Sequence, residues 1–278
     1  MRIKTFKIFP AFILLFFLYR TAVAQENPRY AIIPAPAKLV ARNGFFTINA
    51  KTKIYLGSDD ADMKMAVSYL VELLKNSTGF ICPIVYAGKK RNRIDFFLDS
   101  GITNEEGYVL DITTSGMTIR AKTAKGIFYA VETLKQLMPA GIETKNSGLR
   151  EIAIPAAEIE DAPRFAYRGV MLDVARHFFT IDFLKKYIDA LAFYKINSFH
   201  LHLTDDQGWR IEIRKYPRLQ TIAAWRKETL IGFRTDTPRK YDGIRHGGYY
   251  SQQELKDLVQ YARQRFIAMI PEIDIPGH

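Results

Sequence analysis

Charged and histidine side chains gather at three places in the second half of the chain, each directly after an apolar, strand-like run. The three groups are Asp173, Arg176 and His177; Asp205 and Asp206; and Glu272, Asp274 and His278. Charges at the end of a buried strand are unusual, because burying a charge is costly unless it is paired. In parallel α/β folds, functional side chains lie at the carboxyl ends of the strands. If the three strands run parallel in one sheet, the groups converge on one edge and predict a site there.

The stretch Ile196–Arg210, INSFHLHLTDDQGWR, is the centre of this pattern. Polar and apolar residues alternate from Ser198 onward, which is typical of a strand with His200, His202 and Thr204 on one face. The strand runs into two adjacent aspartates and a Gln-Gly-Trp turn. Two other interpretations stay open at this point. The aspartates could cap a helix beside satisfied core histidines, or the two histidines could be metal ligands.

Predicted strands and helices alternate around these groups. They are a strand at Gly169–Val174, a helix at Ile181–Tyr194 capped by Thr180, a strand at Ile196–Leu203, a helix at Gln252–Arg265 with a Ser251–Glu254 capping box, and a strand at Phe266–Ile273. This order implies a parallel sheet with right-handed crossovers. The segment Lys227–Gly248 shows no periodicity, so we expect a long structureless loop over the site face, a kind of loop that is usually functional or mobile.

Residues 28–160 predict a separate α+β unit. Its expected strands are Ala31–Ile33, Phe45–Ile48, Lys53–Leu56, Ile94–Leu98, Tyr108–Ile112, Met117–Ala121 and Ile152–Ile159, and its helices are Asp60–Ser77 and Ala124–Met138. The pattern suggests a mostly antiparallel sheet with both helices packed on one face. Nothing in this unit has catalytic spacing, so we interpret it as a supporting domain that ends at Asp161-Ala162-Pro163.

Composition and the start of the chain narrow the class of protein. Of 278 residues, 48% are apolar and 25% are charged, so a globular core is expected. Residues 1–24 combine a basic start, the apolar run Ile8–Tyr19 and an Ala22-Val23-Ala24 cleavage site. This predicts a secretory signal peptide and export to the periplasm or the extracellular space. The alternative is an uncleaved anchor, but spanning a bilayer takes about 20 apolar residues.

Charge and cysteine content exclude further classes. The formal net charge is +11, but the basic residues are scattered and form no basic helix, so nucleic acid is not expected as a partner. The single cysteine, Cys82, excludes an internal disulfide framework and a multi-cysteine metal site. After cleavage of the signal peptide, no membrane association is expected.

Three stretches resemble the family 20 glycoside hydrolases, the β-N-acetylhexosaminidases. They are PRFAYRGVMLDVARHF at Pro163–Phe178, INSFHLHLTDDQGWR at Ile196–Arg210, and YSQQELKDLVQYARQRFIAMIPEIDIPGH at Tyr250–His278. Residues 31–160 also look like the α+β domain that precedes the barrel in that family. The resemblance implies an α+β N-terminal domain (28–160) followed by the first three β/α units of a TIM (β/α)8 barrel (161–278). One departure is Phe266, where many relatives carry glycine.

The resemblance also implies roles for individual residues. Arg176 would hydrogen-bond the outer hydroxyls of the terminal sugar, which suits its fixed fork of donors. Asp205 and His278 would form a supporting relay behind the catalytic acid, and Asp274 would help shape the pocket. The family is similar to the substrate-assisted exception among retaining glycosidases, in which the substrate's 2-acetamido oxygen attacks the anomeric carbon. A Glu protonates the leaving oxygen and an Asp orients the acetamido group, with no metal and no cofactor.

The implied substrates are oligosaccharides or glycoconjugates that end in N-acetylhexosamine. The family's Asp-Glu pair belongs at the end of a fourth barrel strand, beyond His278, and a full barrel takes about 250 residues. We therefore expect residues 1–278 to be an N-terminal fragment that is inactive by itself. The alternatives are a truncated, non-catalytic sugar-binding remnant and a metal-dependent barrel hydrolase with His200 and His202 as ligands. The Asp-Asp-Gln-Gly-Trp continuation favours the glycosidase.

Overall fold

The computed structural model describes residues 28–88 and 91–275. The predicted signal peptide and His278 lie outside the described residues. The chain groups into two compact units, Met1–Ala31 and Ile32–His278, and the fold given below is that of the second unit. In the first unit, a short 3-10 helix, η1, covers Pro28–Tyr30. No helix within the described ranges is both long and apolar enough to cross a membrane.

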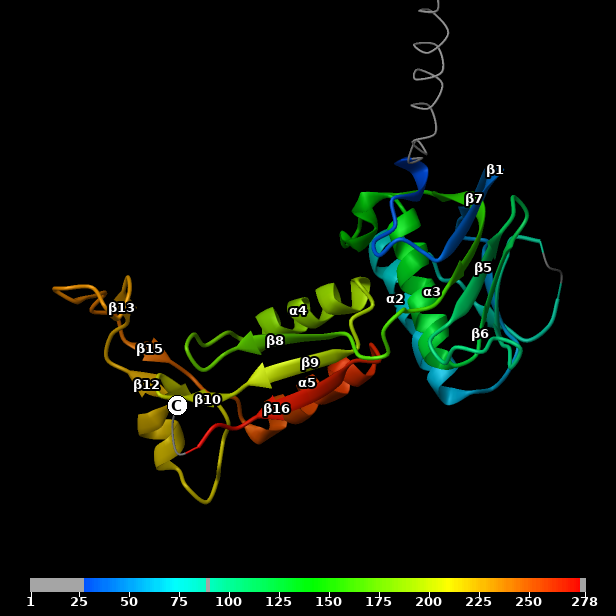
Figure 1. Cartoon of the computed structure of the whole chain (residues 1–278). Helices are drawn as coiled ribbons and strands as arrows, with labels where there is room; N and C mark the ends of the chain where they lie inside the picture. Colours follow the sequence, from blue (N-terminus) through cyan, green and yellow to red (C-terminus); the bar gives the residue numbers. More distant parts are fainter. Residues whose placement is uncertain (1–27, 89–90, 276–278) are drawn as a thin grey trace, which may run out of the picture. The chain divides into compact units, whose positions relative to one another are not determined.

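A seven-stranded sheet forms the core of the α+β domain (Figure 1). Its strands are β1 (Lys38–Ile48), β2 (Lys53–Leu56), β3 (Ile84–Val85), β4 (Arg93–Leu98), β5 (Tyr108–Ile112), β6 (Met117–Ala121) and β7 (Ile152–Asp161). They lie in the order β1-β7-β5-β6-β4-β2-β3. The pairs from β1 to β6 are antiparallel, and those from β6 to β3 are parallel. The predicted hairpin of β5 and β6 is confirmed.

The prediction of a mostly antiparallel sheet is wrong, because half of the sheet is parallel. Helix α2 (Ala61–Thr78) stands between β2 and the strands β3 and β4 in the chain. A helical crossover returns the chain to the end of the sheet from which it left, so the strands that it joins run parallel. The start of α2 agrees with the expected cap, since the Asp60 side chain accepts a 2.7 Å hydrogen bond from the backbone N–H of Met63.

The strand predicted at Ala31–Ile33 is absent from the described residues, and β1 begins only at Lys38. The backbone N–H of Ile33 donates to Gln136 Oε1 (2.7 Å), and Gln136 Nε2 donates to the Ile33 carbonyl (2.9 Å). A side chain of helix α3 (Ala124–Leu137) therefore takes the hydrogen bonds that a neighbouring strand would otherwise supply.

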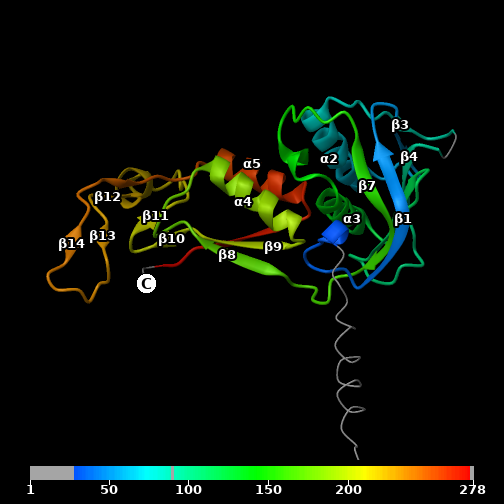
Figure 2. The ribbon, with the colours of Figure 1, turned by 90° about the horizontal axis from the view of Figure 1, so that it is seen from above.

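Strands and helices alternate after residue 168, as predicted. They are β8 (Gly169–Asp173), α4 (Ile181–Phe193), β9 (Ser198–His202), α5 (Gln252–Arg263) and β16 (Ala268–Glu272). The three strands form a parallel sheet in the order β16-β9-β8, with α4 and α5 on one face (Figure 2). The Thr180 cap and the Ser251–Glu254 capping box are confirmed. Within the described ranges the barrel is not closed.

The long connection between β9 and α5 is ordered by short strand pairs. Strands β10 (Thr204–Asp205) and β11 (Gly208–Trp209) pair with each other, and a short π-helix, η3, covers Leu219–Ala223. Next come the pairs β12 (Trp225–Arg226) with β15 (His246–Gly247), and β13 (Leu230–Ile231) with β14 (Lys240–Tyr241). We call residues 225–247 the ribbon.

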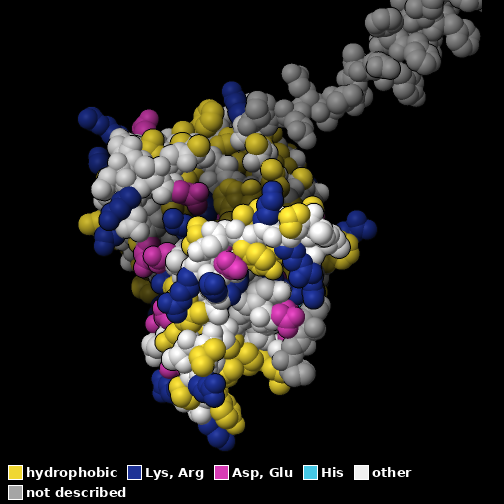
Figure 3. All heavy atoms as spheres, turned by 90° about the vertical axis from the view of Figure 1, so that its left-hand side faces the viewer, with side chains coloured by type: hydrophobic (Ala, Val, Ile, Leu, Met, Phe, Trp, Pro, Cys, Tyr) yellow, Lys and Arg dark blue, Asp and Glu magenta, His cyan; other side chains and the backbone are white. Residues whose placement is uncertain are grey.

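The prediction of a structureless loop at Lys227–Gly248 is thus wrong, because two pairs of two-residue strands hold it. These strands are too short to show a period in the sequence. Figure 3 faces the side of the molecule that carries the ribbon, and hydrophobic and basic side chains are interspersed there. Among the exposed hydrophobic residues of the ribbon are Ile231, Phe233 and Ile244.

The α+β domain contacts the amino ends of the barrel strands. Lys195, which is buried just before β9, places its Nζ 2.8 Å from Asp161 Oδ2 and 2.9 Å from the Tyr108 hydroxyl. Arg168, just before β8, pairs with Glu106 at 2.7 Å. The carboxyl ends of the same strands therefore lie at the opposite edge of the sheet, away from these contacts.

Candidate active site

The last residues of the three parallel strands are neighbours in the sheet. In the register, His202 of β9 faces Asp173 of β8 on one side and Glu272 of β16 on the other. The three charged groups found in the sequence therefore do converge on one edge, as far as their described members show. This edge is the candidate site.

His202 lies between two carboxylates. Its Nδ1 is 2.8 Å from Glu272 Oε2 and its Nε2 is 3.0 Å from Asp205 Oδ2. Ionised carboxylates only accept hydrogen bonds, and the protonated imidazolium, which has a donor on each ring nitrogen, satisfies both of them. Arg176 Nη1, which is also a donor, lies 3.2 Å from the same Nε2. Burial alone would lower the pKa of His202, but the hydrogen bonds to Glu272 and Asp205 outweigh it and raise that pKa above its ordinary value. Hydrogen bonding to His202 in turn lowers the pKa of Glu272.

Arg176 is held by groups from two of the strand ends. Its Nη1 donates to Asp173 Oδ2 at 2.8 Å, its Nη2 lies 2.6 Å from Asp205 Oδ2, and its Nε donates to Gln207 Oε1 at 3.2 Å. The other oxygen of Asp173 accepts the backbone N–H groups of Ala175 and Arg176, both at 2.9 Å. Since 42% of the Arg176 side chain is exposed, a fixed guanidinium faces solvent at the edge of the sheet.

Asp205 is the most enclosed of these acids, with a side chain that is only 1% exposed. Its Oδ2 is shared by Arg176 and His202, and its Oδ1 accepts the backbone N–H of Asp206 at 2.7 Å. A buried carboxylate between two cations is paired, which is the condition for burying charge without a large penalty. Its predicted partner His278 lies outside the described residues, so the relay stays a prediction.

Asp274 is half-buried and is joined through its backbone to β10. Its backbone N–H donates to Thr204 Oγ1 at 2.7 Å, and that hydroxyl donates to the Asp274 carbonyl at 3.0 Å. The segment after β16 is thereby attached to the segment that carries Asp205. The predicted role of Asp274 in shaping a pocket stays a prediction.

The two histidines of β9 pair with the same carboxylate. His200 Nε2 lies 2.7 Å from Glu272 Oε2, the oxygen that also meets His202. Over residues 28–88 and 91–275, no group of three or more His, Cys, Asp or Glu side chains is arranged to hold a metal ion. His200, His202 and Glu272 thus form one hydrogen-bonded network.

The ribbon meets the loop that follows β8. The backbone N–H of Phe178 donates to His246 Nε2 at 3.0 Å, and the rings of His177 and His246 stack at 4.5 Å. Burial, with help from the nearby Arg226, lowers the pKa of His246, so this ring stays neutral and can accept. The ribbon therefore supports the segment that carries Arg176.

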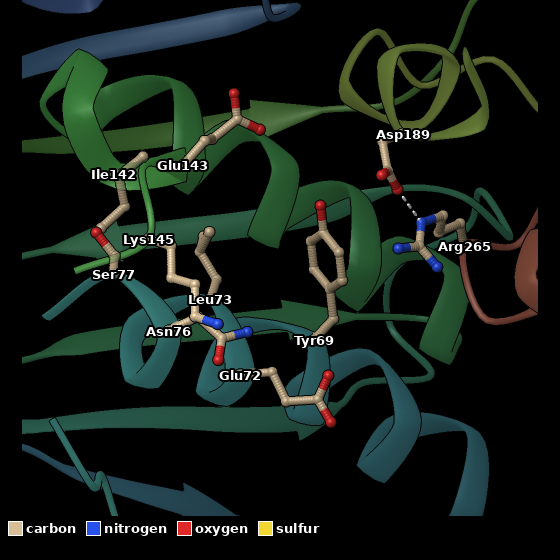
Figure 4. A pocket seen from close by; sticks show the side chains of 10 residues that line it. All are labelled: Tyr69, Glu72, Leu73, Asn76, Ser77, Ile142, Glu143, Lys145, Asp189 and Arg265. Carbon is tan, nitrogen blue, oxygen red and sulfur yellow. Dashed lines mark hydrogen bonds and ion pairs between the residues drawn. The ribbon is translucent and has the colours of Figure 1, made fainter. Parts of the chain in front are cut away.

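A polar hollow of about 400 Å³ lies elsewhere in the structure, lined by residues of α2, α4 and the segments after α3 and α5 (Figure 4). Asp189 and Arg265 form an ion pair at one side of it. None of its lining residues comes from the strand ends, so it is not part of the candidate site.

Comparison with known proteins supplies the family. Residues 29–162 match the model "Glycosyl hydrolase family 20, domain 2", and residues 165–278 match "Glycosyl hydrolase family 20, catalytic domain". The chain belongs to glycoside hydrolase family 20. Two curated relatives are a beta-hexosaminidase of Porphyromonas gingivalis, 41% identical over 89% of this chain, and one of Vibrio furnissii, 36% identical over 92%. The chain spans 30% and 39% of their lengths.

Solved family 20 structures share this fold. A beta-N-acetylhexosaminidase of Streptomyces coelicolor is 37% identical, with a TM-score of 0.76 over 90% of this chain and 47% of its own. An exo beta-N-acetylglucosaminidase of Vibrio harveyi, solved with N-acetylglucosamine, is 35% identical, with a TM-score of 0.75 over 90% of this chain and 37% of its own. The predicted fold class, an α+β domain followed by the start of a family 20 barrel, is confirmed.

Proposed function

We propose that this chain is part of an exported, exo-acting β-N-acetylhexosaminidase that removes terminal β-linked N-acetylhexosamine from oligosaccharides or glycoconjugates. Family membership and the names of the relatives support the reaction class. The pattern of residues 1–24 supports export. The observation that carries the proposal is the fixed, partly exposed guanidinium of Arg176 at the carboxyl edge of the parallel strands.

Arg176 would bind the outer hydroxyls of the terminal sugar. A guanidinium presents several N–H donors in a rigid plane, and sugar hydroxyls can accept from them. The contacts with Asp173 and Asp205 hold this plane before substrate arrives, which lowers the entropic cost of binding. Asp274 would help to enclose the sugar from the adjacent strand end.

Hydrolysis would follow the substrate-assisted route. The substrate's 2-acetamido oxygen would attack the anomeric carbon while a glutamic acid protonates the leaving oxygen, and stereochemistry would be retained. The resemblance assigns that acid and the aspartate that orients the acetamido group to the end of a fourth barrel strand. Asp205, with His278, would support the acid from behind.

A second candidate is sugar binding without hydrolysis by residues 1–278 alone. It is favoured by the observation that the described part of the barrel has three strands and is open. Titration of the protein with N-acetylglucosamine, followed by NMR, separates the two candidates when it is combined with a hydrolysis assay on the same sample. Binding without turnover supports the second candidate.

The main test uses a polypeptide that joins this chain to the remaining barrel strands found in relatives, which we call the full-barrel protein. It should hydrolyse a chromogenic β-N-acetylglucosaminide and leave the matching β-glucoside intact. Arg176→Ala should lower kcat/KM by about 100-fold, mainly through KM. Arg214→Ala is the matched control, since the Arg214 side chain is 72% exposed. Unchanged kcat/KM in Arg176→Ala would remove Arg176 from the site.

A further inference from the structure

The guanidinium of Arg210 is wholly buried and donates to four backbone carbonyls. Its Nε donates to Val174 (2.9 Å) and its Nη2 to Ala175 (2.7 Å), while Nη1 donates to Ala224 (2.7 Å) and Gly248 (3.0 Å). Burial lowers the pKa of Arg210 to about 10, so the group keeps its charge at neutral pH.

These four carbonyls belong to two segments that lie far apart in the sequence. Val174 and Ala175 directly precede Arg176 in the loop after β8, whereas Ala224 and Gly248 flank the two ends of the ribbon. One side chain therefore ties the segment that carries Arg176 to the base of the ribbon. Hydrogen bonds from a charged donor are stronger than neutral ones, so Arg210 joins the two segments strongly.

The carbonyl of Arg176 itself is held from the other side. Arg226, in β12 of the ribbon, donates through Nη1 to the Arg176 carbonyl at 2.8 Å. Three successive carbonyls, from residue 174 to 176, are thus bound by guanidinium groups. The backbone under Arg176 is fixed independently of the contacts that its own side chain makes.

Gly208 packs so closely against the guanidinium of Arg210 that no side chain fits at position 208. A Cβ atom built on Gly208 would lie 2.2 Å from Arg210 Nη2 and 2.3 Å from its Cζ. Both glycine and arginine of the Gly208-Trp209-Arg210 segment are therefore required for this arrangement. A lysine at position 210 would offer a point charge in place of the planar fork and could not reach all four carbonyls at once.

We propose that Arg210 is a positioning residue for substrate binding, which acts by holding the backbone of Arg176 in register with the base of the ribbon. The proposal rests on the function proposed above, in which Arg176 grips the terminal sugar. Arg210 itself touches no substrate. Its effect on turnover should therefore pass through Arg176.

The first test needs no activity and uses residues 1–278. Arg210→Lys should speed hydrogen exchange at the backbone N–H groups of Ala175 and Arg176 by about tenfold or more, as expected when a clamped loop opens locally. Exchange within β9 should stay unchanged. Arg214→Lys is the matched control. Unaltered exchange at residues 175 and 176 in a folded Arg210→Lys protein would overturn the proposal.

The second test is a double-mutant cycle in the full-barrel protein. Arg210→Lys should raise KM by about tenfold with kcat changed less than about twofold, and should add nothing further in an Arg176→Ala background. Additive effects on KM would assign Arg210 a general structural role and overturn the proposal. If Arg210→Lys fails to fold, Gly208→Ala, which crowds the same guanidinium, takes its place. If Arg176→Ala alone leaves KM unchanged, the proposed function fails, whereas the exchange test still decides the clamp.

Discussion

At the scale of single residues, the position of His202 between Glu272 and Asp205 predicts how stability depends on pH. A raised folded pKa of His202 contributes stability that is fully present below its ordinary value of 6.5 and is lost as pH rises through the folded pKa. A lowered folded pKa of Glu272 contributes stability that is present above 4.5 and is lost as pH falls through the folded pKa. Both contributions are complete between pH 4.5 and 6.5.

Glu272→Gln should therefore destabilise the protein most within that window, by about 1 kcal/mol, and much less at pH 9. Urea unfolding at pH 5.5 and pH 9 measures the difference. Glu151→Gln, the same change at an exposed position, serves as the control. A destabilisation of equal size at both pH values would contradict a charge-assisted hydrogen bond between His202 and Glu272.

Asp205→Asn keeps the shape of a buried side chain and removes its charge. Arg176 and His202 then lose their shared anion, and breaking a buried, paired charge should cost roughly 3 kcal/mol. Because Asp205 contacts Arg176 directly, KM of the full-barrel protein should rise. The value of kcat should fall as well, because Asp205 supports the catalytic acid in the proposed mechanism. Denaturant titration and steady-state kinetics check the two effects. A variant with wild-type stability and KM would show that Asp205 acts only through His278.

The family motifs predicted Asp205, Arg176, Asp274 and His278 as site residues. They did not predict that His202 and Glu272 pair with each other, or that Arg210 clamps the backbone. The contacts of His202 and Glu272 depend on the register between β9 and β16, and register across a parallel crossover has no local signal. A clue was present, since each of these two residues lies next to the last residue of a predicted strand. The partners of Arg210 are backbone carbonyls, which every residue has, so no residue type could point to them.

At the scale of elements, the local sequence predicted the helices and their caps reliably, but it did not predict how the strands pair. The helices at Ala61–Thr78 and Gln252–Arg263 were predictable, because their caps and apolar spacing lie within the segment itself. The strand expected at Ala31–Ile33 fails because Gln136, a residue far along the chain, takes its backbone hydrogen bonds. The parallel half of the first sheet likewise follows from crossovers that composition does not show.

Phe266 tests whether strain in one turn is offset by packing. Its φ of 56° lies in the left-handed region, which costs a residue with a Cβ about 1 kcal/mol, and its ring packs 5.4 Å from that of Phe128. Phe266→Ala removes the ring and keeps the backbone strain, so it should lower the free energy of unfolding by about 2 kcal/mol. Phe266→Gly loses the ring but also the strain, so it should be the more stable of the two by up to about 1 kcal/mol.

Thermal unfolding of both Phe266 variants, with Phe165→Ala at an exposed position as the control, measures this order. An alanine variant as stable as the glycine variant would show that the left-handed conformation relaxes when the ring is removed.

At the scale of the whole described fold, the buried joint around Lys195 connects the two domains. Lys195 meets Asp161 and Tyr108, and the Tyr108 hydroxyl also lies 2.6 Å from Thr133 of α3. Burial lowers the pKa of Lys195, and Asp161 opposes that shift only in part. The joint fixes the amino ends of the barrel strands, so the carboxyl ends, with Arg176 and Asp205, depend on a frame that both domains supply.

Lys195→Met should therefore lower the free energy of unfolding by about 3 kcal/mol, because it leaves the carboxylate of Asp161 without its cation. The double variant Lys195→Met/Asp161→Asn removes both charges and should recover a large part of that loss, since a buried ion pair adds little over an uncharged pair of similar size. Urea unfolding of the two single variants and the double variant yields the coupling energy, which should be about 1–3 kcal/mol. Both domains should unfold in one transition when followed by probes in each. Strict additivity of the single variants, or separate transitions in the unaltered protein, would show that the joint is not what couples the domains.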